Sequence, residues 1–217
     1  MPIYNLSSTN SVLSTFVSEL RNEEIQNDPL RFRKNLQRIG EIMAYEISKT
    51  FTYVIKNTHT PLGIDQSPMM NEKLIIGTIL RAGLPLHEGF LNYFDHAENA
   101  FVSAYRKYTD KEHFDIHIEY ISSPDIQGKT LLLVDPMLAT GASLELAYNA
   151  LLTRGHASKI HLACVIASQD GINYLKEKLD LNHINLWCAA IDPDLNSKSY
   201  IVPGLGDAGD LAYGKKI

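Results

Sequence analysis

A chain of 217 residues with 45% apolar and 21% charged residues has the composition of a soluble globular protein and is long enough to bury a sizeable core. Its net charge is −5, from 20 basic and 25 acidic residues. This balance argues against a nucleic-acid partner, because such affinity comes mainly from neutralised phosphates, but it allows a small basic pocket for a phosphorylated metabolite.

The N-terminal part of the chain, about residues 10–50, predicts two amphipathic helices. The first has its apolar residues on one face and takes Asn10 or Ser11 as its N-cap. The second takes Asp28 as N-cap and Pro29 as its first helical residue. Both helices have an apolar stripe that requires a partner surface.

Residues 59–73 predict a loop, because Pro61, Gly63 and Pro68 punctuate them. No apolar run in the chain has the length needed to span a bilayer, and the first residues lack the apolar centre of a signal peptide. We therefore expect a cytoplasmic protein that does not contact a membrane.

From residue 74 onward, apolar runs alternate with helical patterns. The strand-like runs are 74–80, 100–108, 114–120, 129–134, 159–167 and 183–191. A turn and a helix follow at 81–94, and helical patterns follow at 143–155 and 170–179. Strands that alternate with helices predict an α/β fold with a central, mostly parallel sheet flanked by helices. We expect a ligand site at the carboxyl ends of these strands.

Two of the runs carry further information. Residues 114–120 alternate between apolar and polar side chains, which predicts a half-buried antiparallel strand, one arm of a hairpin. Cys164 and Cys188 lie in apolar runs and predict buried core thiols. No cysteine or histidine spacing indicates a metal framework.

The segment Asp135–Ser143 lies where a buried strand ends and a helix begins. The free N–H groups of a helix start favour a phosphate, Gly141 allows the backbone to approach it, and Thr140 adds a hydroxyl donor. Asp135 at the strand end is placed to bind ribose hydroxyls. The alternative is a plain strand–turn–helix joint, which this pattern alone matches equally well. The lysine of a P-loop is missing, so the segment is not a P-loop. A loop that binds one phosphate while a neighbouring acid binds ribose suits a 5-phosphoribosyl group.

Two arginines follow other strands. Arg81 comes directly after residues 74–80, and Arg106 ends another strand-like run. A guanidinium at a strand end can bind a diphosphate through two parallel hydrogen bonds. Each arginine taken alone is a weak signal and is more typical of a solvated strand end or loop start.

The C-terminal stretch 200–214 reads YIVPGLGDAGDLAYG, which predicts a glycine-rich loop. Such a chain exposes its N–H and C=O groups, so it can recognise a planar base through the backbone. Asp207 and Asp210 can contact Mg²⁺ or its water shell. The alternative is a C-terminal loop in which the acids only form turns.

Taken together, VDPMLATGAS, ILRAGL and YIVPGLGDAGDLAYG resemble the uracil phosphoribosyltransferase family, over roughly residues 75–217. The resemblance implies a type I phosphoribosyltransferase fold in one domain over residues 1–217. It implies transfer of the 5-phosphoribosyl group from 5-phosphoribosyl 1-diphosphate (PRPP) to uracil, which gives UMP and diphosphate in pyrimidine salvage.

The resemblance also implies a set of site residues. Those implied in binding PRPP are Arg81, Arg106, Asp135, Pro136, Met137, Leu138, Ala139, Thr140, Gly141, Ala142, Ser143 and Asp207. Those implied in binding uracil are Ile201, Gly206, Asp207 and Ala208. Arg81, Arg106, Asp135 and Asp207 are implied in catalysis, with Mg²⁺ held mainly by PRPP and Asp207 as its candidate protein ligand.

Larger features are implied as well. They are a hairpin arm at about 103–124 used in dimerisation and a hood at about 192–217 over the base, in a homodimer or higher homo-oligomer. A GTP effector, known for some members, is left open. Two residues depart from the family pattern, since Ala142 and Pro85 stand where glycine is usual. The competing hypotheses are a catalytically weak regulator that senses PRPP or UMP, and a transferase for another base.

Overall fold

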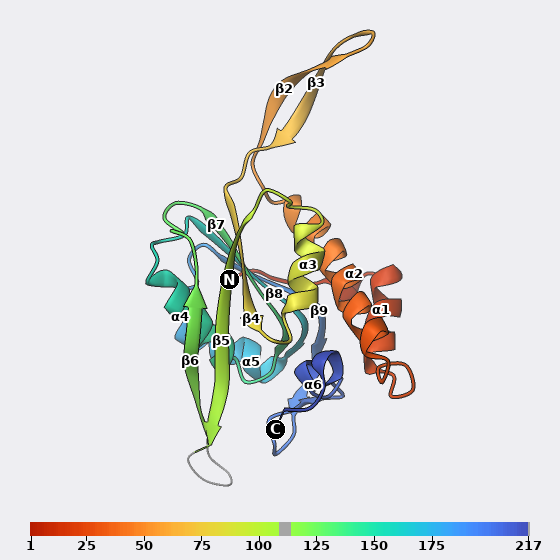
Figure 1. The fold of residues 1–217 in the computed structure, drawn as a ribbon, viewed down its shortest axis with the longest axis vertical. Coiled ribbons are helices and arrows are strands. Elements are labelled where there is room, and N and C mark those ends of the chain that lie inside the picture. Colours follow the sequence, from red (N-terminus) through yellow and green to blue (C-terminus); the bar gives the residue numbers. More distant parts are fainter. Residues whose placement is uncertain (109–113, 217) are drawn as a thin grey trace.

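The computed structural model describes the backbone of residues 1–108 and 114–216 and the side chains of residues 1–103 and 119–216. Within these residues a central sheet of seven strands runs in the order β1-β9-β8-β7-β4-β5-β6 (Figure 1). Its strands are β1 (Ile3–Asn5), β4 (Leu74–Leu80), β5 (Glu98–Tyr108), β6 (Phe114–Ser122), β7 (Thr130–Leu138), β8 (Lys159–Ser168) and β9 (Ile184–Asp192). Neighbouring strands are parallel except β5 and β6. The predicted mostly parallel sheet is confirmed.

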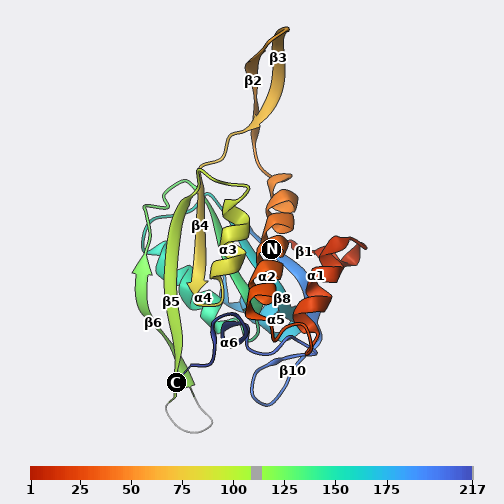
Figure 2. The same cartoon turned by 45° about the vertical axis from the view of Figure 1, so that its right-hand side comes forward.

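Helices cover both faces of the sheet (Figures 1 and 2). One face carries α1 (Val12–Arg21), α2 (Pro29–Ser48) and α3 (Leu84–Leu91), and the other carries α4 (Ala142–Leu152) and α5 (Gln169–Lys178). Leu36 and Phe90 pack in one buried cluster with Ile76, whereas Leu151 packs in the other with Ile75. Neighbouring strand residues point to opposite faces, so one apolar run supplies both cores.

Local signals fixed the helix starts as predicted. Ser11 caps α1 by accepting a hydrogen bond from the N–H of Leu13, and Asp28 caps α2 ahead of Pro29 at the first position. Both cysteines are fully buried free thiols, which confirms the predicted core role. Among the described residues, no helix has the length and apolar character needed to cross a membrane.

The predicted loop at 59–73 was wrong. The strands β2 (Tyr53–Thr60) and β3 (Gly63–Met70) form an antiparallel hairpin with a two-residue turn, and it projects from the body of the molecule (Figures 1 and 2). Most of its side chains are exposed, so no alternation of burial marks it in the sequence. Proline is tolerated because a two-stranded ribbon has only edge strands.

The predicted antiparallel strand at 114–120 is confirmed as β6, which pairs with β5 at the edge of the central sheet. Arg106 lies on β5, opposite Ile116, and its side chain is outside the described residues. The assignment of the dimerisation arm to about 103–124 stays a prediction, and β2–β3 is a second candidate.

The C-terminal stretch is more ordered than the predicted loop. It contains β11 (Ile201–Val202), paired with β10 (Asp194–Leu195), and the short helix α6 (Ala208–Tyr213). Asp207 caps α6, because its Oδ1 accepts a hydrogen bond from the N–H of Asp210 at 3.0 Å. Helix α6 contacts α2 and closes the carboxyl edge of the sheet (Figure 2).

Candidate active site

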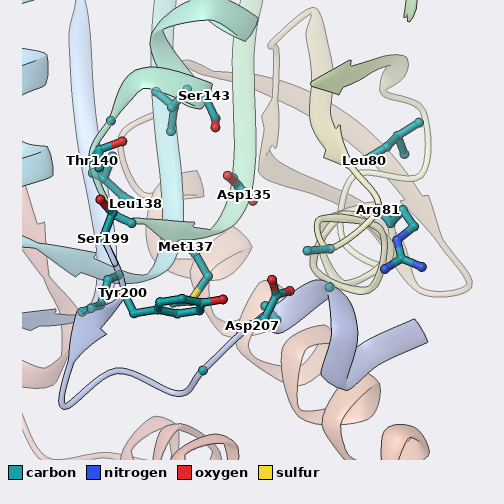
Figure 3. A pocket seen from close by; sticks show the side chains of 18 of the residues that line it. Leu80, Arg81, Asp135, Met137, Leu138, Thr140, Ser143, Ser199, Tyr200 and Asp207 are labelled. Atoms are coloured by element: carbon teal, nitrogen blue, oxygen red, sulfur yellow. The ribbon is translucent and has the colours of Figure 1, made fainter. Parts of the chain in front are cut away.

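An open cavity of about 850 Å³ lies at the carboxyl edge of the sheet (Figure 3). One wall is the β7–α4 loop, with Thr140 and Ser143, and the opposite wall is the hood, with Tyr200 and Asp207. Arg81 flanks the cavity at the end of β4. Strands far apart in sequence end at this edge because the sheet is parallel, which is why the motifs meet.

The β7–α4 loop has the geometry of an anion site. Gly141 precedes α4 with φ +88°, and a Cβ there would lie 2.8 Å from Cδ1 of Tyr174, so glycine is required on both counts. Helix α4 begins at Ala142, where the backbone is helical and a glycine is not needed. The N–H groups of the first turn therefore remain available to a phosphate.

The loop is held from behind by α5. The hydroxyl of Ser168, fully buried, donates a hydrogen bond to the carbonyl of Ala139 at 2.5 Å and accepts one from the N–H of Gly171 at 2.8 Å. Tyr174 donates to Glu145 at 2.6 Å, which links α5 to α4. These contacts fix the loop before any ligand binds, so little ordering is needed on binding.

Asp135 lies between the two walls, near the end of β7 (Figure 3). Burial raises the pKa of its carboxyl to about 8, and the N–H of Met137 opposes this by donating a hydrogen bond. Burial thus favours the protonated carboxyl, which can both donate to and accept from the hydroxyls of a sugar.

Arg81, at the end of β4, contacts the hood. Its Nη2 donates to the carbonyl of Gly214 at 3.1 Å and to Oδ1 of Asp210 at 3.4 Å. The side chain is 40% exposed and borders the cavity, so its guanidinium is accessible to a ligand there.

The hood supplies both backbone and carboxylate groups. Ile201 and Ala208 line the cavity although both are almost fully buried, and Gly206 adds exposed backbone at φ +90°. Oδ2 of Asp207 lies 4.0 Å from Nζ of Lys216, while its Oδ1 caps α6. Within the described residues no group of three or more acidic, histidine or cysteine side chains can hold a metal.

The structure gathers most of the predicted site residues at this cavity. Arg81, Asp135, Met137, Leu138, Ala139, Thr140, Gly141, Ser143, Ile201, Gly206, Asp207 and Ala208 all line it. Pro136, which is buried in the sheet, and Ala142, the first residue of α4, do not line it. The side chain of Arg106 is outside the described residues.

Other lining residues were not predicted from the sequence. They are Leu80, Ala82, Ser103, Leu144, Ser199, Tyr200, Gly209 and Lys216. The pairing of Ser103 with Leu80 across β4 and β5 places it at the same edge, a signal that needs the register. Tyr200 directly precedes Ile201, so adjacency alone could have included it. In Figure 3 its ring lies beside Met137 on the hood side.

Comparison with known proteins identifies the family of the chain. The model of the uracil phosphoribosyltransferase family matches residues 7–215. The chain belongs to the uracil phosphoribosyltransferase family. A uracil phosphoribosyltransferase from Porphyromonas gingivalis is 57% identical over 217 residues, which is 100% of both chains. The resemblance inferred from the sequence motifs is confirmed.

Solved structures agree with the family's fold. The AQ2163 protein from Aquifex aeolicus superposes with a TM-score of 0.86 at 31% identity, over 98% of both chains. A hypoxanthine phosphoribosyltransferase from Staphylococcus aureus has a TM-score of 0.51 at 15% identity, over 75% of this chain and 76% of its own. The second likeness concerns the fold alone and supports the predicted type I phosphoribosyltransferase fold.

Proposed function

We propose that the chain transfers the 5-phosphoribosyl group of PRPP to uracil, giving UMP and diphosphate in pyrimidine salvage. The observation that carries this proposal is a single cavity in which the phosphate-type loop faces the glycine-rich hood. Membership of the family supports the same activity, since the relative named above is identical at more than half of all positions.

PRPP binds along the wall formed by β4 and β7. The 5′-phosphate accepts hydrogen bonds from the N–H groups at the start of α4 and from the hydroxyls of Thr140 and Ser143. The ribose hydroxyls bind the carboxyl of Asp135. The diphosphate takes Arg81, and Arg106 follows from the family resemblance.

Uracil binds against the hood. Its planar edge alternates donors and acceptors, which the backbone of Ile201 and of the segment 206–208 can match. Cytosine presents a donor where uracil presents the O4 acceptor, so a backbone group that donates to O4 is left unpaired. An unpaired buried polar group is costly, and this accounts for selection of uracil.

The chemistry is a substitution at the anomeric carbon of the ribose. N1 of uracil bonds to C1, the bond from C1 to the diphosphate oxygen breaks, and the proton on N1 leaves. No protein nucleophile is needed. The residues position the base against C1, stabilise the leaving diphosphate through Arg81 and exclude water with the hood. The carboxylate of Asp207 can accept the N1 proton.

The residues present suit Mg²⁺ bound mainly through PRPP. Asp207 offers an oxygen donor at the cavity, the ligand type that Mg²⁺ prefers, and one carboxylate together with substrate phosphates is a common arrangement. When bound, the ion neutralises charge on the diphosphate that leaves.

One assay tests the function. UMP formation is measured with uracil, PRPP and Mg²⁺, with cytosine, hypoxanthine and orotate as alternative acceptors and with GTP added as an effector. We expect turnover with uracil alone among the four bases. Absence of turnover with retained PRPP binding would favour the regulator hypothesis. Turnover with another base would favour the hypothesis of a transferase for that base.

We also propose that the hairpin β2–β3 joins two copies of the chain. Its register places the apolar residues Tyr53, Ile55, Ile64, Pro68 and Met70 on one face of the ribbon, together with the polar residues Asn57, His59 and Gln66, and Ile55 and Ile64 are more than 60% exposed. An isolated two-stranded ribbon is only marginally stable, so a second copy is the partner that this apolar face fits.

Sedimentation of the wild type and of an Ile55→Glu, Ile64→Glu double variant tests the interface. We expect a dimer or larger assembly for the wild type and a smaller species for the variant. Equal masses would exclude the hairpin as the interface.

We also propose a cytoplasmic location, which the two free thiols Cys164 and Cys188 support and which cell fractionation can test.

A further inference from the structure

Gly204, in the middle of the hood, has both of its backbone groups bound by side chains from elsewhere in the chain. Its N–H donates to Oδ2 of Asp192 at 2.9 Å, and its carbonyl accepts from Nη1 of Arg21 at 3.0 Å. Its φ is +59°, and a Cβ at this position would lie 2.1 Å from the carbonyl of Ile201. The hood therefore has one fixed anchor point between Ile201 and Gly206.

The two anchoring side chains bind each other as well. Nη1 and Nη2 of Arg21 each donate to one oxygen of Asp192 at 2.8 Å. Arg21 is the last residue of α1 and Asp192 is the last residue of β9, where its carboxylate is largely buried. A planar guanidinium paired with a carboxylate through two bonds has a fixed orientation. One ion pair thus joins an N-terminal helix, the sheet and the hood.

Neither Arg21 nor Asp192 lines the active-site cavity, whereas Ile201 and Gly206 on either side of Gly204 do. We infer that Arg21 and Asp192 are positioning residues for uracil, which set the place of its backbone contacts by clamping Gly204. This inference rests on the proposed binding of uracil at 201–208.

The clamp matters because the proposed readout is by backbone. A side chain can adjust its rotamer to meet a base, but N–H and C=O groups reach it only if the whole segment is held in place. A second anchor lies at the far end of the hood, where Nη1 of Arg33 donates to the carbonyl of Ala212 at 2.7 Å. Residues 206–208 lie between these two anchors, and Ile201 lies three residues before the first of them.

The test variant is Arg21→Gln. We expect its KM for uracil to rise by about tenfold to a hundredfold, the range typical of a displacement of about 1 Å in a positioning element. The dissociation constant of PRPP, measured by calorimetry, should change far less than the KM for uracil, because the hydrogen bonds of Arg21 and Asp192 reach each other and Gly204 rather than the β7–α4 loop. Arg21→Lys keeps one charged donor and should give an intermediate KM for uracil.

Arg31→Gln is the matched control. Arg31 also donates from two nitrogens to one carboxylate, that of Glu19, at 2.8 Å, and it also joins the N-terminal helices. It makes no recorded contact with the hood, so its removal should leave both constants unchanged.

Gly206→Ala, which strains the hood backbone at φ +90°, is measured in parallel. Suppose that the KM for uracil is unchanged in Arg21→Gln. If Gly206→Ala raises that KM, the positioning role of Arg21 is overturned and the proposed uracil site stands. If Gly206→Ala has no effect either, the proposed uracil site is overturned as well. Equal losses for PRPP and uracil in Arg21→Gln, or in Arg21→Lys if the glutamine variant does not fold, would mean a purely structural ion pair and also overturn the inference.

Discussion

Replacing Asp135 by asparagine should make the protein less sensitive to alkaline pH. Burial raises the pKa of this carboxyl from the ordinary 3.8 to about 8. Below the ordinary value the group is protonated in both states. Between the two values the unfolded chain releases a proton that the folded chain keeps, so the stability of the wild type falls as pH rises through this window. Asparagine has the shape of the neutral acid and does not titrate.

The size of the effect follows from the two pKa values. Between about pH 5 and about pH 9, the titration of Asp135 should lower the free energy of unfolding of the wild type by about 4 kcal/mol, an upper limit because water entry relaxes a buried charge. All other titrating groups are common to both proteins and cancel in the comparison. Urea unfolding of wild type and Asp135→Asn at matched protein concentration, at several pH values, measures the difference.

Two parallel curves of unfolding free energy against pH would refute this reasoning. They would mean that the carboxyl of Asp135 is ionised in the folded protein at neutral pH, as a partner or water would allow. A pair of curves that separates as pH rises, with the wild type losing stability relative to Asp135→Asn, is the expected result. PRPP binding by the same two proteins then reports whether the ribose hydroxyls need a carboxyl or accept an amide.

Three further substitutions test the site. Arg81→Ala should raise the KM for PRPP about tenfold to a hundredfold, because charge-assisted hydrogen bonds to the diphosphate are lost, and should raise the KM for uracil far less, because only the contacts of Arg81 with Asp210 and Gly214 at the end of the hood are lost on that side; equal changes would remove the role of Arg81. Asp207→Asn should lower kcat by about 10² or more with an unchanged melting temperature, since asparagine also caps a helix; wild-type turnover would exclude Asp207 from proton transfer. Ala142→Gly should lower the free energy of unfolding by about 1 kcal/mol or less without changing the KM for PRPP, whereas Gly141→Ala should lower it by about 1–3 kcal/mol and weaken PRPP binding. Urea unfolding measures the stability and initial rates measure the KM. A lower KM for PRPP in Ala142→Gly would contradict the helical backbone at this position.

The parts of the fold that the sequence predicted are those in which burial acts locally. The run 74–80 and the later strands are apolar because both of their faces are covered, and the helix starts at Ser11 and Asp28 rest on hydrogen bonds within a few residues. Such signals are complete within a short window, so they can be read without knowing the rest of the fold.

The failures have the opposite cause. The hairpin β2–β3 is exposed on most of its surface, so burial leaves no periodic pattern in its sequence. Helix α6 has six residues, too few for a periodic stripe, and depends on the cap by Asp207 and the contact with α2. β1 is only three residues long and gains its place by pairing with β9, almost at the other end of the chain.

Among the site residues too, those with a local sequence signal were predicted and those placed by distant segments were missed. The β7–α4 loop was predicted because strand, turn and helix start are consecutive. Lys216 and Ser103 were missed, because what places them at the cavity is the fold of distant segments. The clamp on Gly204 is the extreme case, since Arg21 lies 171 positions before Asp192 and no local pattern connects them.

Arg81 has enough donors to contact the hood and the proposed diphosphate at the same time. Its contacts with Asp210 and Gly214 use only Nη2, and within the described residues Nε and Nη1 make no recorded hydrogen bond. A guanidinium has five donor hydrogens, so Arg81 can bind the diphosphate through the free edge while it still holds the end of the hood. In the proposed complex, the residue that binds the leaving diphosphate therefore also helps to hold the hood, which binds the base.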